Sequence, residues 1–208
     1  MRRVNVQLQS DRRAEILAAA ERCFVKSGFH QASMQEICIE AGMSPGNLYR
    51  YFPSKEAIIA GIAERNRAEA AESFAVVGQA PDFFTGLAAV ARHHLVESTA
   101  EEVALCAEIM AESRRNPEVH RVFQDIEADI KARLVGMLRH AAEQGEISRD
   151  LVFVGAAVVL MAIGDGISWR RTVDPGFKAE SVLPLILHMI HGLLTRPVEQ
   201  TALQPEKA

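Results

Sequence analysis

The sequence predicts an all-α protein of about nine helices, with a three-helix head at the N-terminal end and a larger helical body after it. Helix-start signals recur along the 208 residues: Ser44 and Asn116 stand directly before a proline, and Ser33 stands three residues before Glu36. Between them, apolar residues are spaced three and four positions apart, as on one face of a helix. We find no segment with the pattern of a strand.

The composition is typical of a soluble globular protein, with 49% hydrophobic and 24% charged residues. The most apolar run, residues 151–164, has 14 residues, whereas a membrane span needs about 20. The polar N-terminus does not resemble a signal peptide. Cys23, Cys38 and Cys106 are isolated and odd in number, which favours a reducing compartment over a disulfide framework. We therefore expect a cytoplasmic protein.

The net charge of −4 conceals an asymmetry along the chain. Through Arg67 there are 10 Lys and Arg against 7 Asp and Glu, a balance of +3. The remainder then holds 23 − 10 = 13 against 27 − 7 = 20, a balance of −7. A basic N-terminal part suits a polyanionic partner, and an acidic body would keep the rest of the chain away from it.

The first predicted helix begins near Arg12 and Arg13 and ends at Gly28, a residue that suits a helix C-terminus. Its inward residues follow helical spacing and are Ile16, Leu17, Ala20 and Phe24. The leading arginines, which include Arg2 and Arg3, have two readings. They form either a frayed solvated terminus or an arm that lies against phosphate or in the minor groove.

Two short helices follow within residues 33–52. Ser33 and Glu36 form a capping box that starts the first, and Gly42 ends it. Ser44 and Pro45 are an N-cap and a first helical residue that start the second. The second helix turns Leu48 and Phe52 inward and leaves Asn47, Tyr49, Arg50 and Tyr51 for its other faces. Two short helices joined by a tight turn, the second polar outside, make a helix-turn-helix.

Six further helices are predicted after Pro53, which breaks the chain before a Ser54 cap. Their approximate ranges are 55–77, 82–98, 101–115, 117–145, 148–172 and 180–195. We expect a head at residues 1–56, a body at residues 57–208, and a fourth helix that links the two. The last two helices are too apolar for a solvated surface. They are predicted to pair with those of a second chain in a four-helix bundle; the alternative is a wholly internal core.

The segment from residue 33 to residue 56 resembles the DNA-binding domain of the TetR family, the tetracycline-repressor-like regulators. The residues that match the family pattern are Ser33, Ile37, Ala41-Gly42-Met43-Ser44, Gly46-Asn47-Leu48-Tyr49-Arg50-Tyr51-Phe52 and Ser54-Lys55-Glu56. Cys38 stands where the family usually has Ala, and Met43 where it usually has Val. Both are changes between core-type residues. Extended back to Ile16, the resemblance covers about the first quarter of the chain.

The expected DNA contacts fall into two groups. Phosphate contacts are expected from side chains that carry donors and from helix N-termini, which favour anions: Tyr49, Tyr51, Lys55, Ser33 and Ser44. The resemblance places base or groove contacts at Gln35, Pro45, Gly46, Asn47 and Arg50. For the two tyrosines, the alternative is a place in the core, and we expect one of them to be partly buried there.

The body shows no catalytic constellation, so the sequence predicts neither an enzyme nor a cofactor or metal site. His188 and His191 lie three residues apart, but nothing nearby completes a metal site, and they read as bundle or core residues. An effector pocket between helices is predicted, with candidate lining residues Phe84, Glu108, Met110, Phe123, Met161, Asp165 and Trp169. Glu108 or Asp165 would pair with a cationic ligand, or else both are solvated.

The resemblance implies a ligand-responsive transcriptional regulator, a repressor in most family members. It would bind a palindromic operator as a homodimer and be released by a small, largely apolar effector. The effector would change the separation of the two heads through the fourth helix. The alternatives are an activator, a DNA-binding protein without ligand control and, least favoured, an enzyme.

Overall fold

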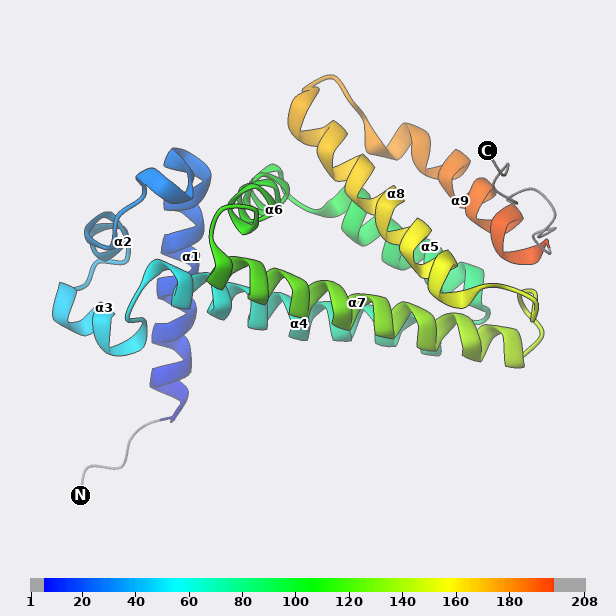
Figure 1. Cartoon of the computed structure of the whole chain (residues 1–208), viewed down its shortest axis with the longest axis horizontal. Helices are drawn as coiled ribbons and strands as arrows, with labels where there is room; N and C mark the ends of the chain where they lie inside the picture. Colours follow the sequence, from blue (N-terminus) through cyan, green and yellow to red (C-terminus); the bar gives the residue numbers. More distant parts are fainter. Residues whose placement is uncertain (1–5, 197–208) are drawn as a thin grey trace, which may run out of the picture. The chain divides into compact units, whose positions relative to one another are not determined.

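The computed structural model describes residues 6–196 and shows nine α-helices and one π-helical segment, with no strand in that range (Figure 1). The elements in order are α1 (Val6–Gln31), α2 (Met34–Glu40), α3 (Pro45–Tyr51), α4 (Lys55–Gln79), α5 (Phe83–Arg92), η1 (His93–Glu97), α6 (Ala100–Ser113), α7 (Pro117–Glu143), α8 (Phe153–Val173) and α9 (Ala179–Thr195). The all-helical prediction and the number of helices are confirmed.

The chain packs into two compact units that are not continuous in sequence. The first unit comprises residues 1–70 and 99–127, and the second comprises residues 71–98 and 128–208. Two of the three boundaries fall inside helices, so α4 and α7 contribute residues to each unit, and the third falls between η1 and α6. The boundary predicted from the sequence, at residue 56, divides the expected DNA-binding head from the expected effector-binding body. By packing, α6 and the first turns of α7 belong with the three N-terminal helices.

The first unit has a continuous apolar core between α1, α2, α3, α4 and α6. Its largest fully buried side chains from α1 to α4 are Phe24, Phe52, Ile16, Ile37, Leu48, Ile58, Ile59 and Ile62. Leu105 of α6 and Val119 of α7 join the same cluster. At Gly61, on α4, a Cβ atom would lie 2.8 Å from the Phe52 ring and 3.0 Å from Leu17. The absence of a side chain there lets α4 approach the rest of the core closely.

The first helix is interrupted at Gly28, the residue predicted to end it, but it starts earlier than predicted and continues to Gln31. Gly28 has φ 75°, a left-handed conformation that interrupts the helix before one last turn to Gln31. The helix begins at Val6 rather than near Arg12. No proline or glycine occurs between residues 6 and 27 to stop it, and Arg12 pairs with Glu15 at 2.6 Å one turn on. Arg2 and Arg3, expected as part of an arm, lie outside the described residues.

The second unit is built around α5, the end of α7, α8 and α9. Figure 1 shows α8 and α9 side by side, joined at one end by the turn that follows Val173. Asp174 and Gly176 form that turn, as predicted from the Asp-Pro-Gly sequence. The start of α8 was predicted at Ser148 and is wrong: the helix begins at Phe153. The Ser148 N–H donates to Leu194 O at 2.9 Å and Leu151 is buried, so this stretch is tied to α9 and to the core.

The predicted helix 82–98 is divided in two. Asp82 caps α5 by accepting a hydrogen bond from the Thr85 N–H at 2.9 Å. After Arg92 the chain forms five residues of π-helix, and Ser98 N–H donates to His93 O at 3.1 Å. Such segments are rare in proteins. In this unit η1 lies against α8 and α9, and the Arg171 guanidinium of α8 donates to Ser98 O at 2.5 Å.

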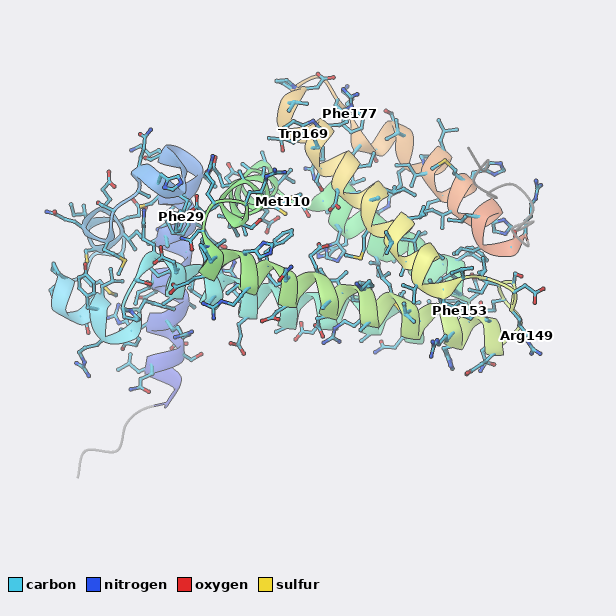
Figure 2. The ribbon with its side chains drawn as sticks, in the orientation of Figure 1. Phe29, Met110, Arg149, Phe153, Trp169 and Phe177 are labelled. Carbon is cyan, nitrogen blue, oxygen red and sulfur yellow. The ribbon has the colours of Figure 1, made fainter. Side chains whose placement is uncertain are left out.

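The outward sides of α8 and α9 carry an unusual number of exposed apolar side chains. They are Val152, Val154, Val158, Val159, Trp169, Val173, Leu185 and Met189. Trp169, near the C-terminal end of α8, is 61% exposed (Figure 2). By length and composition α8 could cross a membrane, but one such helix is weak evidence for a membrane protein. An uncovered apolar face on two adjacent helices is equally typical of an oligomer interface.

Candidate nucleic-acid interface

The start of α2 has the predicted capping box. The Glu36 N–H donates to Ser33 Oγ at 3.1 Å, and the Glu36 carboxylate accepts the Ser33 N–H at 2.7 Å. The Ser33 N–H and the Ser33 hydroxyl both donate to the Glu36 carboxylate, and these bonds lower the pKa of Glu36 below its usual value. The box fixes where α2 begins, and Ile37 and Cys38 are then turned into the core.

The turn between α2 and α3 is closed by backbone hydrogen bonds around Gly42. Gly42 has φ 62°, and Met43 N–H donates to Cys38 O at 3.0 Å. Cys38 is 2% exposed, and Met43 packs against the same core. The two departures from the family pattern are therefore both core residues, as expected. Burial also raises the pKa of the Cys38 thiol, which makes this cysteine unreactive.

Helix α3 begins with Pro45 in its first turn, as predicted. Ser44 holds the N-cap position with extended backbone, but its hydroxyl does not cap the helix; its carbonyl accepts from Asn47 and Leu48 N–H. Leu48 and Phe52 are 0% and 1% exposed. These two side chains anchor α3 to the core and fix which of its faces remains outside.

The outer surface of α2 and α3 contains the predicted DNA contacts. Gln35, Ser44, Pro45, Gly46, Tyr49 and Arg50 are exposed, and Asn47 and Tyr51 are half-buried. Tyr51 packs against the core, whereas Tyr49 is 51% exposed. One of the two tyrosines is thus partly a core residue, as the sequence led us to expect.

Lys55 has a structural role that the sequence did not reveal. Its ammonium group donates to Phe29 O at 2.5 Å, Ala32 O at 2.8 Å and His30 O at 3.3 Å. The same nitrogen lies 4.5 Å from the centre of the Phe29 ring. An ammonium group has three donors, so this geometry uses all of them on the carbonyl groups that end α1. The phosphate contact expected from Lys55 is untested and would compete with these bonds.

The acidic residues of α6 hold the same end of α1 from another side. Glu108 Oε2 accepts the Phe29 N–H at 3.3 Å, and Glu112 Oε2 lies 2.7 Å from His30 Nε2. Phe29, labelled in Figure 2, is buried between these contacts and Lys55. Sequence reasoning treated Glu108 as a ligand contact and did not single out Glu112. A buried glutamate in an otherwise ordinary helix sequence gives no local signal.

The seven predicted pocket residues do not all belong to one unit. Glu108, Met110 and Phe123 lie in the first unit, and Phe84, Met161, Asp165 and Trp169 lie in the second. The rings of Phe84 and His191 contact each other at a tilt of 40°, with 4.5 Å between their centres, so His191 belongs to the packing of α9 on α5. Asp165 and Trp169 are exposed on α8. Partial desolvation of its carboxyl group by neighbouring residues raises the pKa of Asp165.

The capped helix pair, its tight turn and the polar outer face of α3 define a DNA-binding protein of the helix-turn-helix class. Two family models match the chain: the bacterial regulatory proteins of the tetR family over residues 16–62, and the C-terminal region of BetI-type transcriptional repressors over residues 87–195. The chain belongs to the TetR family of transcriptional regulators.

Individual relatives agree with this assignment. The HTH-type transcriptional regulator UidR of Escherichia coli (strain K12) is 32% identical over 186 residues, which are 88% of this chain and 93% of the relative. The structure of Salmonella enterica GusR has a TM-score of 0.79 and 34% identity, and covers 88% of this chain and 95% of that chain. A transcriptional regulator FadR from Bacillus subtilis in complex with stearoyl-CoA, at 18% identity and a TM-score of 0.70, shares the fold over 87% of this chain and 98% of its own.

Proposed function

We propose that this protein is a cytoplasmic, ligand-responsive transcriptional repressor that binds a palindromic operator as a homodimer. The observation that carries the proposal is the helix pair α2 and α3, which is anchored by Leu48 and Phe52 and leaves Gln35, Asn47 and Tyr49 at or near the surface. Side-chain amides can pair with adenine in the major groove, which is worth about 1–3 kcal/mol of discrimination per good contact. The exposed Tyr49 hydroxyl suits a phosphate.

The dimer is proposed to form through α8 and α9. Exposed residues on α8 recur at alternating spacings of four and three, at Gly155, Val159, Ala162, Gly166, Trp169 and Val173, which is the seam of a helix bundle. A Cβ atom at Gly166 would meet nothing within 4 Å in its own chain, so no contact inside the protomer explains a glycine there. A second helix that approaches closely would explain it.

The effector is proposed to bind the helical body and to act by favouring one separation of the two heads. A ligand can shift that equilibrium only by its differential affinity for the two arrangements. The abundance of apolar residues in the second unit supports an effector with a large apolar part. A fold neighbour, FadR from Bacillus subtilis, is known in complex with stearoyl-CoA, which supports an effector of this kind.

The proposal is tested by binding and by assembly. The wild-type protein should select a palindromic duplex from a random library and bind it about 10³-fold or more tightly than random DNA at physiological salt. Sedimentation should show a dimer, and Val159→Glu or Leu185→Glu should yield monomers. Ile39→Glu is the matched control, because Ile39 is 74% exposed on α2, outside α8 and α9. A monomeric wild-type protein that binds the selected palindrome at full strength would refute the proposal.

The direction of regulation needs a separate measurement. A reporter gene placed behind the selected duplex should be expressed less when the protein is present. Increased expression would identify an activator instead. An effector, once found, should weaken operator binding by the same factor by which the operator weakens effector binding, and equal affinities with and without DNA would remove the proposed ligand control.

A further inference from the structure

A solvent-open groove lies between the first turns of α1 and the last turn of α3. It is lined by Gln9, Ser10, Arg13, Arg50 and Tyr51 and has a volume of about 460 Å³. Three of these residues come from α1 and two from α3, and both helices belong to the first unit. The family match begins only at residue 16, so the α1 side of the groove lies outside the segment that identifies the DNA-binding domain.

Every lining side chain can donate a hydrogen bond, and none is acidic. Arg13 and Arg50 supply guanidinium groups, Ser10 and Tyr51 hydroxyl groups, and Gln9 an amide. Within the part of the chain that the structure describes, no carboxylate pairs with Arg13 or Arg50. Arg12 offers the contrast, since it pairs with Glu15 at 2.6 Å. The groove therefore concentrates positive charge and donors that no acceptor within residues 6–196 neutralises.

The position of Arg13 is fixed by the core beneath it. Its guanidinium carbon lies 4.4 Å from the centre of the Phe52 ring, a favourable cation–π arrangement. Phe52 is 1% exposed and forms part of the core of the first unit. Tyr51 likewise packs against that core. Two of the five lining residues are thus held in place before any ligand arrives, which lowers the entropic cost of binding.

Arginine donors in a planar fork match the oxygen atoms of a phosphate group, and charge-assisted hydrogen bonds of this kind are about twice as strong as neutral ones. We propose that the groove binds one phosphate of the DNA backbone, held by Arg13 and Arg50 together, with Ser10, Tyr51 and Gln9 as neutral donors. The inference rests on the proposed function and deepens it. The DNA footprint then includes the first turns of α1.

The assignment changes the role expected for Arg50. The family resemblance placed Arg50 among the residues expected to make base or groove contacts. A phosphate contact positions the protein on the duplex but carries no sequence information, whereas a base contact specifies sequence. With Arg50 bound to a phosphate beside Arg13, the base contacts from α3 would come from Asn47 and from its exposed neighbours at the start of the helix.

The test is the salt dependence of DNA binding, measured by fluorescence anisotropy between about 50 and 200 mM salt. Arg13→Ala and Arg50→Ala should each weaken binding to the selected palindrome and to random DNA by a similar factor, about tenfold, which corresponds to about 1.4 kcal/mol. The slope of log K against log salt is negative, and losing one phosphate contact should make it less steep by about 1 for each groove bound. Because both arginines hold one phosphate, the double variant should lose little more than either single variant.

Arg12→Ala is the matched control: it removes the neighbouring arginine, which is not in the groove, and should leave the slope unchanged. Arg13→Lys keeps the charge without the fork and should fall between wild type and Arg13→Ala. Thermal unfolding of each variant verifies that the fold is intact. An unchanged slope for both groove variants would overturn the proposal, as would an Arg50→Ala variant whose base preference changes at one position while its slope does not.

Two further measurements distinguish a DNA phosphate from a free anion, and separate a failure of the groove proposal from a failure of the proposed repressor function. Inorganic phosphate, titrated against chloride at constant ionic strength, should compete only weakly with DNA. Tight binding of inorganic phosphate that Arg13→Ala abolishes, with DNA slopes unaffected, would make the groove a site for a free anion and refute the DNA role. A wild-type protein that does not distinguish its selected palindrome from random DNA would refute the proposed repressor, while the slope on random DNA still tests the groove.

Discussion

The carboxylate of Glu112, in α6, lies 2.7 Å from Nε2 of His30, in the last turn of α1. Glu112 is 1% exposed, whereas the His30 side chain is 64% exposed. The distance is that of an ion pair, but Oε2 has no aligned hydrogen bond among the described residues. Arg115 Nε lies 3.8 Å from the same oxygen. The buried Glu112 carboxylate of α6 therefore depends for its contact on His30, at the end of α1.

Removal of either partner should destabilise the first unit. Glu112→Ala leaves a small cavity, and His30→Ala leaves a buried carboxylate short of a partner, so each should cost about 1–3 kcal/mol of unfolding free energy. The double variant should show a coupling energy of about 0.5–2 kcal/mol in urea unfolding. The pair His140 and Glu143, 4.0 Å apart and exposed on both sides, is the control and should show almost none. Equal coupling in the two pairs would contradict this account.

Gly61→Ala should destabilise the protein although alanine is the better helix former. The new methyl group would meet the Phe52 ring at 2.8 Å and Leu17 at 3.0 Å, both of which are buried. Overpacking of this kind costs about 1–3 kcal/mol. The control is Gly136→Ala on α7, where nothing lies within 4 Å of the new atom; it should be stabilising by up to about 1 kcal/mol. Urea unfolding of both variants measures the difference.

Acid should weaken the fold as three carboxylates become protonated. Hydrogen bonds from Ser33 lower the pKa of Glu36, and hydrogen bonds from Thr85 lower the pKa of Asp82. For Glu56, burial works to raise the pKa, but hydrogen bonds from its own backbone, Ser54 and Asn116 lower it overall. A lowered pKa in the folded state contributes stability above the unfolded value and loses it as pH falls through the folded one.

The unfolding free energy should therefore fall as the pH drops below the usual range of carboxylate pKa values, about 4. Ser33→Ala should cost about 0.5–2 kcal/mol at neutral pH and should also reduce the loss on acidification, because Glu36 loses its hydrogen-bonding partner. Denaturant titrations at several pH values measure both effects. An acid dependence that Ser33→Ala leaves unchanged would show that the capping box is not one of its sources.

Asp165 should show the opposite dependence. Partial desolvation raises its pKa, so the ionised form is disfavoured in the folded protein, and this cost grows as pH rises from the unfolded pKa to the raised one. Asp165→Asn should therefore increase the unfolding free energy at neutral pH and leave it unchanged in acid, where both forms are neutral. Asn and Asp have similar helix propensity. Asp125→Asn, at an exposed position of α7, is the control. A loss of stability at neutral pH would show that the ionised carboxylate has a favourable partner.

The parts of the fold that the sequence predicted correctly depend on local signals. Ser33 with Glu36, Gly42 and Pro45 each act within four residues, so their effect can be read without the rest of the chain. Glu108 meets Phe29 across 79 positions of sequence, and no local pattern announces such a contact. The start of α8 was misplaced for the same reason, since Ser148 is held by Leu194. The outer residues of α3 could be named, but the groove formed with α1 depends on packing.

The exposed valines of α8, with Leu185 and Met189 of α9, would link folding to protein concentration in the proposed dimer. If a second chain covers them, each subunit gains part of its stability from mass action. The melting temperature should then rise as the solution is made more concentrated. At the low copy number of a regulator in a cell, newly made subunits would be the least stable form of the protein and the first to be degraded.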